Sequence, residues 1–176
     1  DPTMLIEKKK WDKLARDYKK RDYILVYRFS GSNNMDMFIK QLAKETGCEI
    51  VIISYSLKRT LKATYEKVVG PLEFLGLFKN ARYVVTNSFH GTAFSINLNK
   101  QFFVEMLPES QGVNSRLINI LEVFDLQSRQ IINGENKSIY EQIDYNKVNL
   151  KLKIERSKSI DFIQRIIQDI KTDLKI

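Results

Sequence analysis

The chain is poor in the residues that build several common kinds of site. A single cysteine, Cys48, excludes an intrachain disulfide and any metal site made of clustered thiolates. The only histidine is His90, so the usual zinc sites of cysteine and histidine are excluded as well, and we expect no metal and no bound cofactor. No Gly-x-Gly-x-x-Gly or P-loop pattern occurs, which excludes the two commonest glycine-rich phosphate-binding loops.

Structure-breaking residues and long apolar runs are scarce too. Only 7 glycines and 3 prolines leave no low-complexity stretch, and no internal repeat is visible, which argues against disorder. No run approaches the roughly 18 to 20 apolar residues of a membrane span, and the N-terminus lacks the order of a signal peptide. We therefore expect no transmembrane segment and a cytoplasmic protein, either free or peripheral to the inner face of the membrane.

Positive charge is in surplus, with 29 Lys and Arg against 21 Asp and Glu and a net charge of +8. Such a surplus steers anionic partners at long range. Many of the lysines lie in helix-like segments, from Lys8 to Lys20 and from Lys151 to Lys175, where a solvated helix face accounts for them. No basic run alternates with aromatic residues as a nucleic-acid stacking platform requires, so we expect no nucleic-acid partner.

The apolar content is sufficient for one core. A hydrophobic share of 43% over 176 residues favours a single globular domain, residues 1–176. Apolar runs predict strands at 23–29, 49–55, 82–86 and 101–105 and a short edge strand at 129–132. Periodicity predicts helices at 7–18, 35–45, 71–80, 90–97, 114–124 and 146–174, the last with one break, while 56–69 is interpreted as a loop with some helix.

Strand, helix and strand joined by short loops describe parallel βαβ units. The predicted fold class is therefore α/β, a Rossmann-like three-layer domain with a mainly parallel sheet of about five strands. In such sheets ligands bind beyond the carboxyl ends of the strands, where helix N-termini offer free N–H groups and a partial positive charge. A predicted strand gives way to a helix in the segment Thr86-Asn87-Ser88-Phe89-His90-Gly91-Thr92, so we expect the chemistry there.

Four residues of this segment have expected roles. Ser88 would cap the helix, Gly91 would let the backbone approach a ligand closely, and Thr92 would offer its hydroxyl to the same anion. His90 can change its protonation near neutral pH and is the candidate general acid. A lone histidine is more often structural than catalytic, and its place at a strand-to-helix junction is what favours a role in catalysis.

Two stretches resemble the signature of the polysaccharide pyruvyl transferase family. The first is Gly70-Pro-Leu-Glu-Phe-Leu-Gly-Leu-Phe-Lys-Asn-Ala, followed by Tyr83-Val-Val-Thr-Asn-Ser-Phe-His-Gly-Thr-Ala-Phe-Ser-Ile. The second is Asn114-Ser115-Arg116-Leu117, followed by Asp125-Leu126. The resemblance is close over 70–129 and looser before it. Members of the family transfer the enolpyruvyl unit of phosphoenolpyruvate to a sugar, most of them forming a cyclic ketal on two hydroxyls.

The resemblance implies more than the residues alone. It implies that the chain, which begins with Asp1 rather than Met, is the C-terminal, donor-binding half of a GT-B-like two-domain fold, with an N-terminal domain before it. It further implies phosphoenolpyruvate as donor and a saccharide acceptor, free or lipid-linked, from bacterial cell-surface polysaccharide synthesis. The donor-binding residues would be Arg28, Asn87, Ser88, Gly91, Thr92, Asn114, Ser115 and Arg116.

Arginine suits this donor because its planar fork can bond two oxygens of a carboxylate or phosphate. Arg116, at the start of a predicted helix, is the first candidate and Arg28, late in the first strand, is the second; a solvent-facing position is the alternative for each. Many members carry Arg-Leu-His-Gly where this chain has Ser88-Phe89-His90-Gly91, so an arginine contact to the donor is replaced here.

Two other functions stay open. The chain could be part of a GT-B glycosyltransferase that binds a nucleotide sugar on this domain. It could also be a non-enzymatic module for anionic ligands, in which case binding would depend strongly on salt and would be indifferent to His90.

Overall fold

The computed structural model describes residues 1–54, 59–108, 112 and 114–173. Its helices are η1 (Pro2–Leu5), α1 (Lys8–Leu14), α2 (Asn33–Thr46), α3 (Pro71–Asn80), α4 (Phe89–Asn97), α5 (Ser115–Val123), η3 (Gln127–Arg129) and α6 (Tyr145–Asp173). Its strands are β1 (Tyr23–Tyr27), β2 (Ile50–Ile53), β3 (Thr64–Glu66), β4 (Ala81–Thr86), β5 (Gln101–Glu105) and β6 (Gln130–Ile131).

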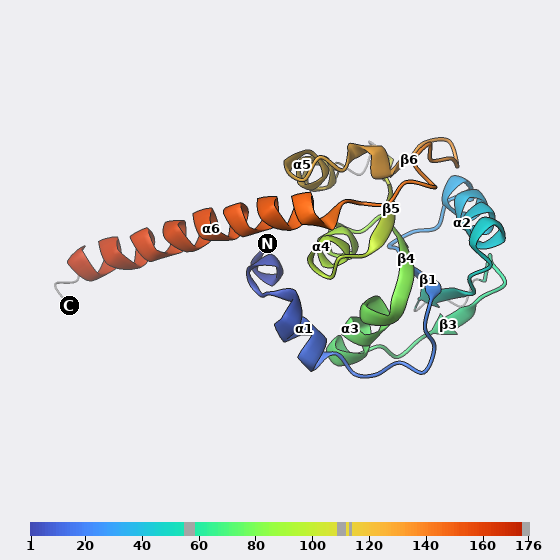
Figure 1. The fold of residues 1–176 in the computed structure, drawn as a ribbon, viewed down its shortest axis with the longest axis horizontal. Helices are drawn as coiled ribbons and strands as arrows, with labels where there is room; N and C mark the ends of the chain where they lie inside the picture. The colour runs from blue at the N-terminus through green and yellow to red at the C-terminus, as the bar shows by residue number, and fades with distance from the viewer. Residues whose placement is uncertain (55–58, 109–111, 113, 174–176) are drawn as a thin grey trace.

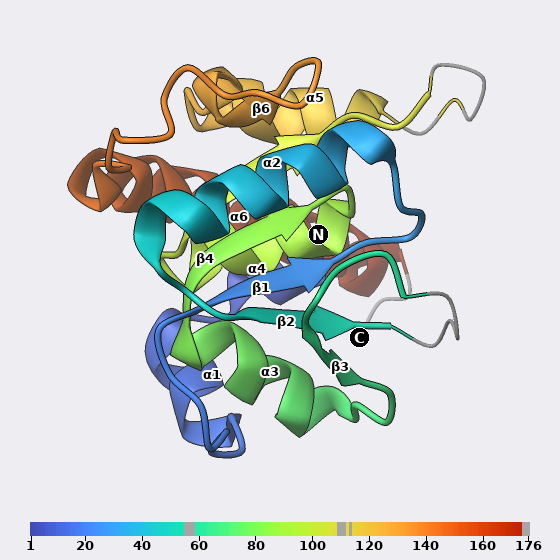
Figure 2. The same ribbon diagram turned by 90° about the vertical axis from the view of Figure 1, so that its right-hand side faces the viewer.

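The strands form one parallel sheet in the order β3-β2-β1-β4-β5-β6. This is the doubly wound order. From β1 the chain adds β2 and β3 on one side and then β4, β5 and β6 on the other, so the switch point lies between β1 and β4. The arrowheads of β1 and β2 point to the same edge of the sheet in Figure 2, and the chain after β1 leaves from that edge. The predicted Rossmann-like α/β class is confirmed.

Helices cover both faces of the sheet, giving three layers (Figure 1). On one face α2 buries Met35, Phe38, Ile39 and Leu42 against alternate residues of β1, β4 and β5. On the other face α3, α4, α5 and the first half of α6 pack against the remaining residues of the same strands. Because every central strand is covered on both faces, the strands are almost continuously apolar, as their sequences indicated.

The first helix is shorter than the predicted range of 7–18, because α1 ends at Leu14. The chain then leaves the helix to run along α3, where the Arg16 N–H donates to the Leu72 carbonyl at 2.9 Å. A Cβ atom on Gly76 would lie 1.8 Å from the Arg16 carbonyl oxygen, so the two backbones touch at this point. A tertiary contact thus ends the helix where local periodicity predicted that it continues.

Two further predictions about the strands are wrong. The first strand ends at Tyr27, which leaves Arg28 and Phe29 in the loop at the carboxyl edge. The segment 56–69 was expected to contain some helix, but its described part holds the strand β3, which pairs with β2; residues 55–58 lie outside the described part. The strand β3 lies at the edge of the sheet, and its three residues, Thr64, Tyr65 and Glu66, are only half-buried. Because such a strand needs no run of apolar residues, its sequence did not indicate a strand.

The predicted break in the C-terminal helix is absent, and α6 runs without interruption over 29 residues. No glycine or proline follows Gly134, so no residue of the tail disfavours a continuous helix. The second half of α6 leaves the body of the domain (Figure 1), and its isoleucines Ile163, Ile166 and Ile167 are 41–48% exposed. None of the helices in the described ranges is both long and apolar enough to cross a membrane.

At the opposite end of the sheet from the loops after the strands, a half-buried lysine lies between backbone carbonyls. The Lys100 ammonium donates to the carbonyl oxygens of Lys79 and Ala81, which end α3 and begin β4. Burial lowers the pKa of Lys100 to about 8, and the nearby charge of Lys8 adds to this effect. The native state therefore binds the proton of Lys100 less tightly than the unfolded chain does.

We predict that this lysine makes stability rise with pH. Between pH 8 and 10.5 the unfolded state keeps the Lys100 proton while the native state loses it, so the free energy of unfolding increases through this window. The free energy of unfolding of wild type minus that of Lys100→Met should therefore increase by up to about 1.4 kcal/mol per pH unit in this window. Urea denaturation at several pH values measures it, and a difference that does not change with pH would contradict the prediction.

Candidate functional site

The first turn of α4 is capped as predicted. Ser88 is the N-cap, and its Oγ accepts the Gly91 N–H at 3.4 Å. The Ser88 N–H donates in turn to the Thr86 Oγ1 at 3.0 Å, and that hydroxyl donates to the Tyr27 carbonyl. These bonds join the start of α4 to the ends of β4 and β1. The N–H groups of Phe89 and His90 precede the first intrahelical bond and have no partner within the helix.

Gly91 brings α4 into direct contact with the sheet. A Cβ atom at this position would lie 2.2 Å from the Thr86 Oγ1 and 3.1 Å from the Tyr27 Cδ1. The close approach that Gly91 permits in the structure is therefore to β4 and β1. The glycine is itself buried, so a ligand would reach the outer side of the turn and not this residue.

The hydroxyl of Thr92 is also used inside the protein. It donates to the Ser88 carbonyl at 3.1 Å, and Ser88 and Thr92 are both fully buried. Ser88, Gly91 and Thr92, three of the residues proposed to bind the donor, thus lie on the buried side of the turn and hold its backbone in place. The structure does not bring them to the surface of a cavity.

Asn87 closes the crevice between β1 and β4. Its side-chain oxygen accepts the Phe29 N–H at 2.9 Å, and its amide nitrogen donates to the Ser30 carbonyl at 2.9 Å. In doubly wound sheets this crevice is the usual ligand site. Here the amide of Asn87 bridges it, so any ligand must lie above or beside this amide.

A cavity of about 290 Å³ lies next to the start of α4 and brings three of the predicted residues together. His90 and Asn87 line it from the β4–α4 junction, and Arg116 lines it from the first turn of α5. Its other walls are Phe29, Phe89, Leu107 and Leu117. The cavity is thus an apolar recess with a histidine, an amide and a guanidinium, which suits a small anion with an apolar part.

The apolar walls were missed from the sequence. Phe29 was assigned to the buried strand, yet it lies in the loop after β1 and is 70% exposed. A large exposed aromatic residue beside the switch point would have been a signal, had the strand end been placed correctly. Nothing in the sequence marked Leu107 or Leu117 as part of a site, because a leucine is expected equally in an ordinary hydrophobic core.

Arg116 stands over the ring of Phe89. Its guanidinium carbon lies 4.6 Å from the ring centroid, within the range of a cation–π contact. The contact joins the first turns of α4 and α5, and it holds an exposed guanidinium at the edge of the cavity.

The His90 side chain is 47% exposed and has an acidic neighbour. Its Nε2 lies 3.3 Å from the Asp1 Oδ2, an ion-pair distance when the imidazole is protonated. The ring of Phe89 meets that of His90 edge to face, with centroids 5.6 Å apart. The imidazole is therefore held between η1 and the first turn of α4, at the wall of the cavity.

Arg28 does not join this group. Its guanidinium forms a salt bridge with Asp36 of α2, the two side chains being only 11% and 13% exposed, and it donates to the Thr60 Oγ1 at 3.1 Å. It packs on Gly31, and it does not line the cavity that holds His90. An arginine that leaves an apolar strand must reach solvent or a partner, and here a carboxylate on the following helix satisfies it.

The other two predicted donor-binding residues have separate places. Asn114 exchanges two hydrogen bonds with the backbone of Leu107, at 3.0 and 2.7 Å, and so closes the loop between β5 and α5. Ser115 is the first residue of α5 and is exposed. Neither residue lines the cavity, although both place Arg116 beside it.

A buried carboxylate at the same edge was missed. Glu105 ends β5 and is 9% exposed, and its two carboxylate oxygens share the single proton of the Ser32 hydroxyl, at 2.6 and 2.8 Å. Ser32 caps α2 by accepting the Met35 N–H, so the acid stands at the positive end of that helix. Among the described residues no group of three or more potential metal ligands occurs.

We predict that Gly91→Ala lowers the free energy of unfolding by about 1 to 3 kcal/mol, because the new methyl group overlaps the Thr86 hydroxyl. Removing that hydroxyl should relieve part of the overlap. The loss in the double variant Thr86→Ala/Gly91→Ala should therefore be smaller than the sum of the two single losses. Urea denaturation of the four proteins measures the coupling, and strictly additive losses would show that the contact is not the cause.

Comparison with known proteins agrees with the resemblance seen in the sequence. A family model described as "Polysaccharide pyruvyl transferase" matches residues 1–106, which include the whole first turn of α4 but not Arg116. No curated protein sequence matches the chain.

Solved structures similar to the chain include UDP-GlcNAc 2-epimerase from Neisseria meningitidis bound to UDP-GlcNAc, at 13% identity and a TM-score of 0.42, covering 88% of this chain and 48% of that one. The Methanocaldococcus jannaschii enzyme in complex with UDP-GlcNAc and UDP has 18% identity and a TM-score of 0.40, covering 91% and 49%. The chain thus spans about half the length of these epimerases. The family match covers more than half of the 176 residues, and the chain therefore belongs to the polysaccharide pyruvyl transferase family.

Proposed function

We propose that the cavity beside α4 binds phosphoenolpyruvate and that the reaction is pyruvyl transfer to sugar hydroxyls of a cell-surface polysaccharide precursor, forming a ketal. One observation carries the proposal: His90 and Arg116 belong to different elements, yet they line the same cavity at the N-terminus of α4. The family match supports the same class of reaction.

The cavity offers complementary groups for each part of this donor. The Arg116 guanidinium can bond two oxygens of the carboxylate or the phosphate. The N–H groups at the start of α4 that have no partner within the helix, together with the helix's positive end, favour the other anionic group. The apolar walls formed by Phe29, Leu107 and Leu117 suit the methylene carbon.

His90 would supply the proton that starts the reaction. A proton moves from the imidazolium to the methylene carbon, the electrons of the double bond form the new C–H bond, and the central carbon becomes an oxocarbenium-like centre. One sugar hydroxyl attacks this carbon, a second displaces the phosphate with its bonding electrons, and a cyclic ketal results. Of the two hydroxyl protons, one restores the histidine and the other leaves on the phosphate.

Arg116 would replace the arginine contact that the Ser-Phe-His-Gly turn lacks. Its guanidinium comes from α5, but the stacking on Phe89 places it directly against the same turn. The segment that carries Arg116 lies outside the residues matched by the family model, so its assignment rests on this geometry.

The proposal extends to the complete protein. In it the chain is the C-terminal half of a GT-B-like two-domain enzyme of the bacterial cytoplasm, and an N-terminal domain helps to bind the saccharide acceptor, free or lipid-linked. Asn87 would position the loop after β1 under the donor, which makes it a structural part of the site.

We predict that Arg116→Gln weakens phosphoenolpyruvate binding by roughly 10- to 100-fold, because a hydrogen bond to a charged group is lost. NMR titration of this chain should show saturable shifts of Phe89, His90 and Arg116 that exceed those caused by inorganic phosphate. Arg165→Gln is the matched control, since it removes the same charge from the exposed half of α6 and should leave binding unchanged. If UDP-GlcNAc shifts these signals and phosphoenolpyruvate does not, the proposed donor is wrong and a nucleotide sugar takes its place.

Turnover provides a second test, on the complete protein. His90→Gln keeps a polar side chain of similar size but cannot donate a proton as an acid, so kcat should fall by about 10²- to 10⁴-fold while KM for phosphoenolpyruvate changes little. Release of phosphate that depends on the acceptor measures kcat. A variant that turns over at the wild-type rate would remove His90 from the mechanism.

A further inference from the structure

We propose that Asp1 is the positioning residue of His90: its carboxylate pairs with Nε2 of the imidazolium and leaves Nδ1 as the nitrogen that gives its proton to the donor. This inference rests on the proposed function, because it assigns a role within the same proton transfer. It adds a residue from the far end of the chain that no sequence pattern had indicated.

The Asp1 carboxylate has two separate functions in the structure. Its Oδ1 caps η1, accepting the Thr3 N–H at 2.8 Å and the Thr3 hydroxyl at 2.6 Å. Its Oδ2 lies 3.3 Å from the His90 Nε2. The Asp1 side chain is 12% exposed and that of His90 is 47% exposed, so the pair lies at the surface with its carboxylate side covered.

The segment that carries Asp1 is fixed to the domain by two polar side chains, the buried Asn97 and the half-buried Arg156. Asn97 of α4 donates to the carbonyl oxygens of Thr3 and Ile6 at 3.0 and 3.1 Å. Arg156 of α6 donates to those of Met4 and Ile6 at 2.6 and 3.1 Å, and to the Asn97 side chain at 2.7 Å. Such bonds restrict η1 to one position, which a group that orients a catalytic side chain requires.

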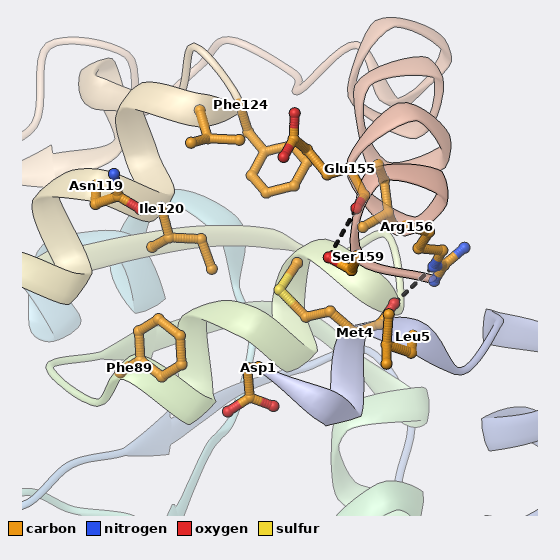
Figure 3. A pocket seen from close by; sticks show the side chains of 12 residues that line it. Asp1, Met4, Leu5, Phe89, Asn119, Ile120, Phe124, Glu155, Arg156 and Ser159 are labelled. Carbon is orange, nitrogen blue, oxygen red and sulfur yellow. Dashed lines mark hydrogen bonds between the residues drawn. The ribbon is translucent and has the colours of Figure 1, made fainter. Parts of the chain in front are cut away.

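Figure 3 shows Asp1 and the neighbouring residues of η1 from the side of a second cavity. This cavity, of about 180 Å³, lies between η1, α4, α5 and α6, and both Asp1 and Phe89 line it. In the view, Asp1 lies between Phe89 and Met4, and Arg156 donates to the Met4 backbone. Phe89 also lines the cavity of His90, so its ring separates the two spaces.

Asp1 is the acidic partner of the His90 ring. The positive end of α4 and the guanidinium of Arg116 lie close by, and Arg116 lines the same cavity. Asp1 is the carboxylate that the described part of the chain places at ion-pair distance from the ring. The pair therefore fixes the direction in which the imidazole presents its second nitrogen.

The pair also determines which nitrogen reacts. With Nε2 directed at Asp1, the proton on Nδ1 is the one that moves to the methylene carbon, and its N–H bonding electrons stay on Nδ1. The imidazole is then neutral, with its remaining proton on Nε2 beside the carboxylate. A hydroxyl proton of the acceptor restores Nδ1–H, which closes the proton balance.

Asp1→Asn separates this role from helix capping. Asparagine caps a helix as well as aspartate does, so η1 should remain in place while the charge beside His90 is lost. Thr3→Val is the matched control, because it removes the Thr3 hydroxyl bond to Asp1 and leaves the carboxylate next to the imidazole.

The experiment has two readouts. In the complete protein, Asp1→Asn should lower kcat by roughly 10- to 100-fold with KM for phosphoenolpyruvate within about threefold, Asp1→Glu should recover part of the loss, and Thr3→Val should turn over like wild type. In this chain, without any donor, the NMR shift of the His90 Nε2 should move in Asp1→Asn and stay at the wild-type value in Thr3→Val, because only the first variant changes the group that faces this nitrogen.

The outcomes distinguish the two proposals. Wild-type kcat in Asp1→Asn, together with an inactive His90→Gln, would overturn the role of Asp1 and leave the proposed function standing. Equal losses in Asp1→Asn and Thr3→Val would reduce Asp1 to a cap of η1 and overturn the role as well. If wild type transfers no pyruvyl group, the proposed function and the positioning role both fail, and the nitrogen shifts then report only whether the pair exists.

Discussion

The contact between Gly91 and the ends of β1 and β4 is the constraint on which the candidate site depends. Only a residue without a Cβ fits where the Thr86 hydroxyl lies 2.2 Å from the position that such an atom would take. Because α4 begins against the sheet, His90 and Phe89, on the outer side of the same turn, stand at the carboxyl edge. If α4 began farther from the sheet by the width of a side chain, the imidazole would be separated from Asp1 and the ring of Phe89 from Arg116.

The crevice between β1 and β4 is filled by the protein's own polar groups. Asn87 bridges the loop after β1, and Glu105 holds Ser32 across the end of β4. The carboxylate of Glu105 thereby takes the positive end of α2, where an anionic ligand would otherwise be favoured. The N–H groups of Phe89 and His90 have no partner within α4, so the proposed anion site lies in the recess between α4 and α5 and not at the centre of the crevice.

Local sequence signals predicted the framework of the site well. Ser88 caps α4 as predicted, because a capping residue acts within one turn of its own position, and the helix predicted at 71–80 is the observed α3. The site was only partly predictable, because its contacts join residues far apart in the chain. Nothing near Arg28 indicated that Asp36 would pair with it, and nothing near Asp1 indicated His90. The polar edge strand β3 and the early end of α1 were missed for the same reason: the sheet and α3 impose them.

The net charge of +8 is not gathered at the candidate site. Several cations that contribute to the surplus are paired locally with acids: Lys8 with Asp12, Arg16 with Glu73, Lys20 with Glu49, Arg28 with Asp36, Lys151 with Asp125 and Lys158 with Glu155. Among the described residues that line the cavity of His90, Arg116 is the only lysine or arginine. A phosphoenolpyruvate anion in this cavity would meet one guanidinium, the positive end of one helix and one imidazolium. The Asp1 carboxylate lies 3.3 Å from the imidazole, so in the proposed complex few charges would surround the donor, and binding would depend on how well these few groups are placed.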